Sequence, residues 1–122
     1  MRRVIAGIVL LGIGFGAGIA AAPKALDPVA VAPHIYELAF ENEKVRVLKR
    51  IVRNGETSPL IAQPDRVVVY INPCGWMEPD GNGGERMRSY KFGDPTWVAA
   101  NTHGGDTSTV IQTCHILEVE IL

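Results

Sequence analysis

The chain has 122 residues, which is enough for one small domain. Hydrophobic residues make up 47% of the composition and charged residues 20%, values that are typical of a globular protein and exclude a wholly disordered chain. The 12 lysines and arginines against 13 acidic residues give a net charge of −1. A general nucleic-acid binder needs a cluster of basic residues, so we expect no nucleic-acid partner.

Residues 1–21 are predicted to be a secretory signal peptide. Arg2 and Arg3 precede an apolar stretch without charged or polar side chains, residues 4–22, and this stretch ends in small residues. Cleavage after Ala20 or Ala21 would place the protein in the periplasm or outside the cell. The stretch is also close to the length that spans a bilayer, so the alternative is a membrane anchor formed by residues 4–22.

The two cysteines are a disulfide candidate. Export would place Cys74 and Cys114 in an oxidising compartment, where two cysteines can pair in only one way within a chain. The alternative is two separate thiols, one or both of them buried.

Strand patterns dominate the chain after a Pro/Ala linker, which we expect over residues 22–33. Short apolar or alternating runs are bounded by glycine and proline turns, and no helical pattern continues beyond two turns. A glycine-rich tip at 80–84 predicts a hairpin. The expected strands lie at 35–40, 45–52, 66–71, 76–78, 85–92 and 112–122. The pattern predicts an all-β domain over residues 34–122, either a sandwich or a barrel.

Alternation along these strands predicts which side chains face the core. On the last strand we place His115 with Leu117 on the inner face, and Glu118 and Glu120 on a solvated face. Trp76 and Trp97 are expected in the core or at the lip of a barrel. Six basic residues are expected to lie on an ordinary solvent-exposed surface rather than to form an anion-binding patch: Lys44, Arg46, Lys49, Arg50, Arg53 and Arg66.

Residues 33–122 resemble the small single-domain cupins of bacteria. The resemblance rests on Pro-His-Ile-Tyr at 33–36, followed by Phe-Glu-Asn-Glu-Lys-Val-Arg-Val-Leu at 40–48. It also rests on the order of turns, in which Gly93 and Asp94 are followed by Trp97 and by Asn-Thr-His at 101–103. The resemblance implies a cupin jelly roll, the double-stranded β-helix barrel.

The resemblance also implies a metal site, from which this chain departs. Metal-binding cupins carry two histidines and a glutamate in a first motif, and another histidine in a second motif. These ligands suit Fe, Mn, Ni or Zn. Here the two histidine positions fall on Ile61 and Gln63, the glutamate position falls within 67–69, and His103 remains. We therefore predict no metal, no cofactor and no catalytic residue.

The sequence thus predicts an exported cupin-like protein without catalytic activity, which binds a small organic ligand or serves as a scaffold. Gln63 and His103 are predicted to line the cavity as hydrogen-bond donors and acceptors. One alternative is a cupin metalloenzyme, an oxygenase or isomerase, in which Asp65 and His115 join His103 as ligands. Without such a site, His34 is expected at the surface and His115 partly buried within the sheet. Another is a structural or partner-binding homodimer joined through an edge strand.

Overall fold

The structure, a computed structural model, describes residues 24–122. The predicted signal peptide at 1–21 and the alternative anchor at 4–22 lie outside the described residues. Within 24–122, no helix has both the length and the apolar character needed to cross a membrane.

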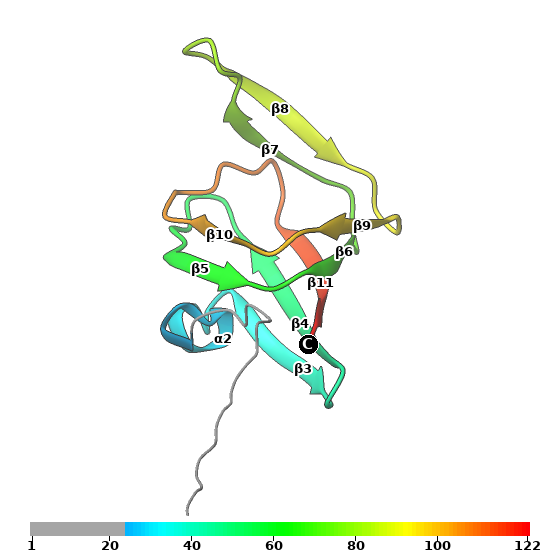
Figure 1. Ribbon diagram of the computed structural model, residues 1–122. Helices are drawn as coiled ribbons and strands as arrows, with labels where there is room; N and C mark the ends of the chain where they lie inside the picture. Colours follow the sequence, from blue (N-terminus) through cyan, green and yellow to red (C-terminus); the bar gives the residue numbers. More distant parts are fainter. Residues whose placement is uncertain (1–23) are drawn as a thin grey trace, which may run out of the picture.

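A five-stranded antiparallel sheet forms the larger layer of the domain, in the order β3-β4-β11-β6-β9 (Figure 1). Its two longest strands pair over their full length, from Cys114 opposite Val52 to Ile121 opposite Val45. This pairing places two polar alternations side by side on one face of the sheet. The strands are β3 (Tyr36–Glu41), β4 (Val45–Val52), β6 (Arg66–Tyr70), β9 (Pro95–Val98) and β11 (Cys114–Ile121).

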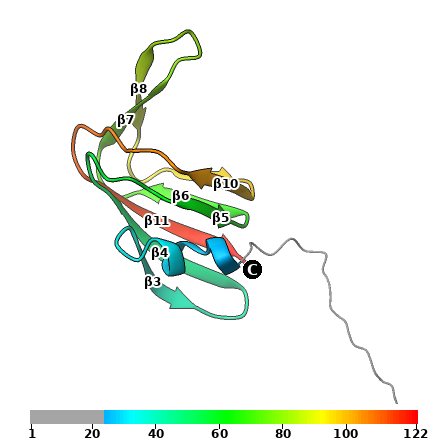
Figure 2. The same ribbon diagram turned by 90° about the vertical axis from the view of Figure 1, so that its left-hand side faces the viewer.

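Two further strand pairs complete the domain. The pair β5 (Leu60–Gln63) and β10 (Asn101–Gly104) covers the inner face of the large sheet, since Gln63 on β5 hydrogen-bonds to side chains on β11. The hairpin of β7 (Cys74–Pro79) and β8 (Glu85–Tyr90) extends away from these layers (Figure 2). All strands pair antiparallel, so the all-β prediction is confirmed, and the facing layers agree with the expected jelly roll.

The segment from residue 24 to residue 33 packs against the strands. It holds a 3-10 helix η1 (Lys24–Leu26) and a short helix α2 (Pro28–Val31), whose first turn is capped by the Asp27 carboxylate. Ala32 is fully buried in a cluster with Tyr36, Leu48 and Ile61. This differs from the Pro/Ala linker expected over 22–33, because a helix cap and burial of Ala32 order a segment whose composition is typical of a mobile one.

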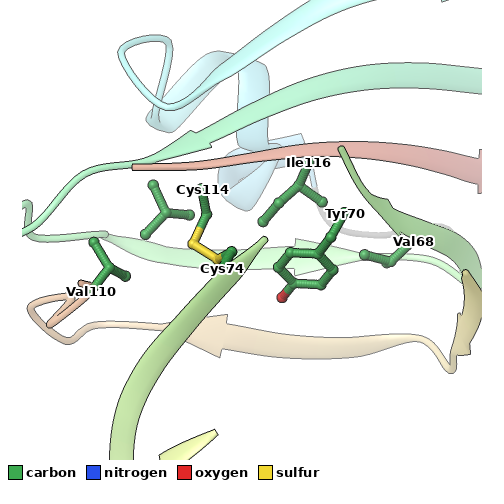
Figure 3. Packing of buried hydrophobic residues seen from close by; sticks show 7 residues of the cluster. Val68, Tyr70, Cys74, Val110, Cys114 and Ile116 are labelled. Carbon is green, nitrogen blue, oxygen red and sulfur yellow. A yellow bond between two sulfur atoms is a disulfide. The ribbon is translucent and has the colours of Figure 1, made fainter. Parts of the chain in front are cut away.

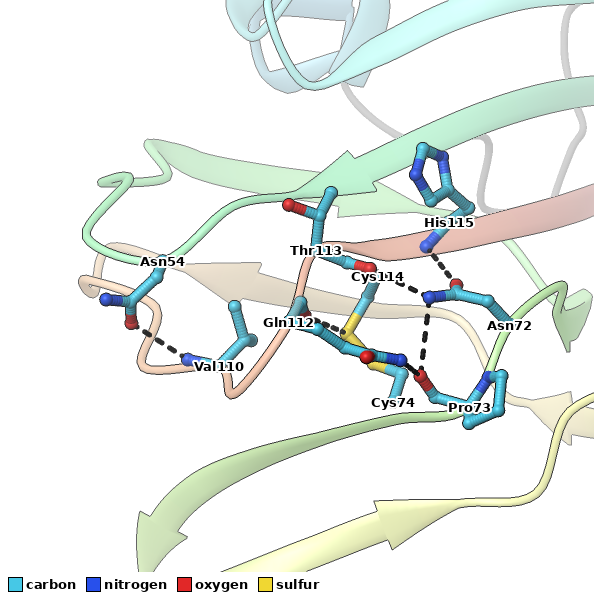
Figure 4. Close-up of a disulfide and its surroundings, with 9 residues drawn as sticks. All are labelled: Asn54, Asn72, Pro73, Cys74, Val110, Gln112, Thr113, Cys114 and His115. Atoms are coloured by element: carbon cyan, nitrogen blue, oxygen red, sulfur yellow. Dashed lines mark hydrogen bonds between the residues drawn. A yellow bond between two sulfur atoms is a disulfide. The ribbon is translucent and has the colours of Figure 1, made fainter.

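The main hydrophobic cluster lies between β11, β6 and the start of β7 (Figure 3). Cys74 and Cys114 form a disulfide at its centre, with 5.4 Å between their Cα atoms. Next to it, the Asn72 side chain donates to the Thr113 carbonyl at 2.9 Å and accepts from the His115 amide at 2.8 Å (Figure 4). The disulfide therefore joins the hairpin β7-β8 to the large sheet.

The prediction for the two faces of β11 is wrong. His115 is exposed, whereas Glu118 and Glu120 point inward and are 0% and 1% exposed. The physical reason lies on β4, where Arg46 bonds to Glu120 and Arg50 bonds to Glu118, so cations on the neighbouring strand compensate the buried charges. Trp97 is also misplaced by the prediction, because it lies on the outer face of the sheet and is 58% exposed.

Candidate functional site

Gln63 and His103 meet inside the domain, on the paired strands β5 and β10. The Gln63 amide nitrogen Nε2 donates to Glu118 Oε1 at 2.7 Å and to Glu120 Oε2 at 2.8 Å. The Gln63 oxygen Oε1 lies 2.7 Å from His103 Nε2. The two residues predicted to bind a ligand are therefore in direct contact, above the two glutamates of β11.

The glutamates fix the protonation of His103 through Gln63. Since both hydrogens of the Gln63 amide face carboxylates, its oxygen faces His103 and must accept, so His103 Nε2 carries a proton and donates. The Nδ1 atom is left as an acceptor. Gln63 is 2% exposed and all its polar atoms are bonded, so it orients His103.

Burial, together with the positive charges of Arg50 and Arg66, lowers the pKa of His103 to about 4. The imidazole is therefore neutral at physiological pH. A neutral ring with a fixed tautomer is suited to hydrogen bonding with a ligand, and His103 lines a cavity at the mouth of the barrel.

Gly104, which follows His103, is required for this placement. Its φ is +97°, a left-handed conformation that favours glycine, and a Cβ there would collide with the Pro59 carbonyl on the way into β5. The close approach of these two segments of the chain keeps β10 paired to β5 and holds His103 next to Gln63.

Arg46 and Arg50 lie inside the domain, so the expectation of a wet surface is wrong for them. Arg46 donates to Glu120 Oε1 at 2.9 Å and bridges to Asp27 at 2.6 Å, while Arg50 donates to Glu118 Oε2 at 3.2 Å. The signal in the sequence was a pair of matched alternations, basic along β4 and acidic along β11. Only the register of the two strands shows that these basic and acidic residues lie next to each other.

Arg66 is buried as well, and its expected position at the surface is also wrong. Its guanidinium Nη1 donates to Asn101 Oδ1 at 2.9 Å, and its Nε lies 3.6 Å from Glu118 Oε1. Glu118 thus faces both Arg50 and Arg66. Lys44, Lys49 and Arg53 are exposed, as the prediction requires.

Two adjoining cavities open beside these side chains, with volumes of about 310 Å³ and 180 Å³. Both are lined by Arg50, Arg66 and Tyr90. The larger one also contacts His103 and Trp76. The Arg50 guanidinium lies between two aromatic rings, 5.4 Å from the centre of Tyr36 and 5.5 Å from the centre of Trp76. The mouth of the barrel is therefore a mixed aromatic and cationic surface.

The residues at the cupin metal positions do not fit a divalent cation. Ile61 offers no donor atom, and the Gln63 amide hydrogens already occupy the carboxylates of Glu118 and Glu120. A cation between those carboxylates would also face the guanidinium groups that they bind. Within residues 24–122, no three His, Cys, Asp or Glu side chains gather as a metal site.

The alternative ligand set around His103 does not assemble. Asp65 is exposed and its Oδ1 accepts from the Ala100 amide at 2.8 Å. His115 lines a separate cavity of about 500 Å³ on the outer face of the large sheet, and His34 is exposed. These side chains therefore lie apart from His103.

The state of His103 predicts how stability depends on pH. The ordinary histidine pKa of about 6.5 applies to the unfolded chain, whereas the folded value is about 4, so the unfolded chain takes up the proton first as pH falls. The contribution of His103 is complete above about pH 6.5 and is lost as pH falls toward 4. Urea unfolding at pH 7 and pH 5 should show a larger loss in the native protein than in His103→Gln, whose amide can still donate to Gln63.

His34 and His115 are exposed and are present in both proteins, so their contribution cancels in this comparison. Equal losses of unfolding free energy in the native protein and in His103→Gln would contradict the assignment of a buried neutral imidazole.

Three solved structures of bacterial proteins are similar to this chain. A cupin domain from Bordetella pertussis Tohama I has 19% identity and a TM-score of 0.46, over 72% of this chain and 92% of that one. A "putative mannose-6-phosphate isomerase" from Ralstonia eutropha JMP134 has 22% identity and a TM-score of 0.47, over 89% of this chain and 98% of that one. A protein from Neisseria meningitidis has 11% identity and a TM-score of 0.46, over 71% and 82%.

No family model matches the chain, and no curated protein matches it in sequence. At these identities, the residues of this chain, and not those of its structural neighbours, decide what the site can bind.

Proposed function

We propose that the chain is an exported cupin-like protein without catalytic activity, which binds a small organic ligand at the mouth of its barrel. One observation carries this proposal: Gln63, at a position where the resemblance to cupins implies a metal ligand, is enclosed in a network with Glu118 and Glu120, while His103 and Trp76 line an open cavity beside it. The scaffold is thus retained, and its polar groups are arranged for hydrogen bonding.

Two features support export. The sequence begins with the pattern of a signal peptide over residues 1–21. The Cys74–Cys114 disulfide is compatible with an oxidising compartment such as the periplasm.

The roles of Gln63 and His103 differ in this proposal. Gln63 is enclosed and acts as a positioning residue, because its three hydrogen bonds are made to other side chains of the chain. His103 is the group that meets the ligand. Its free Nδ1 accepts a hydrogen bond, while Trp76 and Tyr90 provide apolar surface.

The chain contains two tryptophans, one in the cavity and one on the outer face, and this permits a matched test. In Trp97→Phe, the remaining tryptophan is Trp76 and its fluorescence reports on the cavity. We would titrate this variant with carboxylic acids, amines, alcohols and sugars of small size. At least one class should change the Trp76 emission in a saturable way.

The variant Trp76→Phe keeps Trp97 and serves as the control; it should give no saturable signal with the same compound. His103→Ala should weaken binding of that compound in the Trp97→Phe background. The proposal fails when no class changes the Trp76 emission, or when both single-tryptophan proteins respond equally.

A further inference from the structure

The charge of the cavity walls points to the class of ligand. Arg50 and Arg66 lie at the cavity with 17% and 5% of their side chains exposed. The Nε atom of each is buried without a hydrogen-bond partner among the described residues. Glu118 is the carboxylate that faces both of them, so two guanidinium groups share one negative charge. Buried cations with incomplete compensation favour the binding of an anion.

A third arginine adds to this excess in the smaller cavity. Arg88, on β8, lines the 180 Å³ cavity with Arg50 and Arg66, and its guanidinium lies 5.4 Å from the centre of the Tyr90 ring. Glu118 is the acidic residue in that lining. The nearest carboxylate to Arg88 is Glu78 at 3.6 Å, and Glu78 lines the larger cavity together with Asp106. The positive excess is therefore concentrated in the smaller cavity.

The remaining walls of the smaller cavity are mostly apolar. Val68 and Val98 belong to or pack against the main hydrophobic cluster, and Tyr70 stacks on Tyr90 with 4.3 Å between ring centres. An inorganic anion would leave these surfaces without contacts. An organic anion would place its charged end at the arginines and its apolar body along them.

We infer that the smaller cavity, where it adjoins the larger one, binds the charged end of small monocarboxylates with an apolar or aromatic body. This inference rests on the proposed function, because the smaller cavity adjoins the one lined by His103 and Trp76 and shares Arg50, Arg66 and Tyr90 with it. Arginine is suited to this task because its planar guanidinium donates two parallel hydrogen bonds to a carboxylate. The carboxylate lies between Arg66 and Arg88, and the body extends along Val98 and Tyr90. Tyr90 is also a wall of the cavity that His103 and Trp76 line.

The test compares four probes by calorimetry with the native protein and by Trp76 fluorescence with Trp97→Phe. Benzoate carries both charge and body, benzamide has the same shape without charge, phosphate has charge without body, and benzylamine has the opposite charge. Benzoate should bind at least tenfold more tightly than each of the other three. Its affinity should decrease with added salt, because the contact is partly electrostatic.

Matched variants locate the charge. Arg88→Gln removes one cation of the cavity and should weaken benzoate binding several-fold. Arg86→Gln is the control, because Arg86 lies two residues away on the same strand, faces the same Glu78 at 3.0 Å, and does not line the cavity. It should leave benzoate binding unchanged. Both arginines are largely exposed, at 57% and 63%, so neither variant threatens the fold.

The outcomes separate this inference from the proposed function. Equal binding of benzamide or benzylamine would overturn the inference and leave the cavity as a site for other organic molecules. Equal binding of phosphate would also overturn it, because the apolar walls would then play no part. Equal weakening by Arg88→Gln and Arg86→Gln would place the anion elsewhere. Absence of binding by all four probes overturns the inference, and the broader set of compounds then decides whether the proposed function stands.

Discussion

Replacement of Glu118 by alanine is expected to lower the free energy of unfolding by about 3–5 kcal/mol. Glu118 is fully buried, and it accepts hydrogen bonds from Gln63 at 2.7 Å and from Arg50 at 3.2 Å. Its removal leaves Arg50 and Arg66 inside the domain with no carboxylate between them, and an unpaired buried charge costs more than the lost contacts alone. Urea unfolding followed by circular dichroism measures this change.

The control for this variant is Glu41→Ala. Glu41 lies on β3 and is exposed, so its replacement should change the free energy of unfolding by less than about 0.5 kcal/mol. Similar small effects of both substitutions would show that Glu118 is not needed to compensate the arginines, and the description of a closed buried network would be wrong.

Removal of the disulfide, in Cys74→Ala/Cys114→Ala, is expected to cost about 4 kcal/mol. The two cysteines are 40 residues apart in sequence, and the bond restricts the unfolded chain across that length. For a domain of this size such a loss lowers the Tm by roughly 15–30 °C. Thermal unfolding of the native protein and the double variant under non-reducing conditions gives the comparison.

A reducing agent supplies the control. It should lower the Tm of the native protein to near that of the double variant, and leave the double variant unchanged. If the native protein kept its Tm after complete reduction of the bond, the stabilisation would come from packing of the cysteine side chains in the core rather than from the cross-link.

The sequence was sufficient to predict the elements that have a local sequence pattern. The strand at 45–52 has the predicted bounds, and the glycine-rich tip at 80–84 does connect two paired strands. In both cases the pattern is local, because a turn or an alternation can be recognised without knowing which strand lies next to it.

Three strands were not predicted because they lack such a local pattern. β5, β9 and β10 have four residues each, and β10 reads Asn-Thr-His-Gly, which contains no apolar residue. These strands are held by their partners rather than by their own pattern, as the pairing of His103 with Ile61 shows.

The charged interior could not be predicted for a different reason. Glutamates at 118 and 120 are typical of a solvated face, and only their pairing with Arg46 and Arg50 on β4 makes their burial favourable. The resemblance to cupins singled out Gln63 and His103 as cavity residues, but it did not predict the contact of Gln63 with two glutamates. The arginines of the cavity were missed together with those glutamates.

The shared hydrogen bonds of Gln63 have a consequence for how this protein can vary. Both amide hydrogens are committed to Glu118 and Glu120, and the amide oxygen is committed to His103. A substitution at any one of these positions leaves a buried group of another unpaired, so the cost of each change depends on which residues the others already are. In descendants of this chain, these positions and their arginine partners are therefore constrained to evolve together, as one epistatic unit.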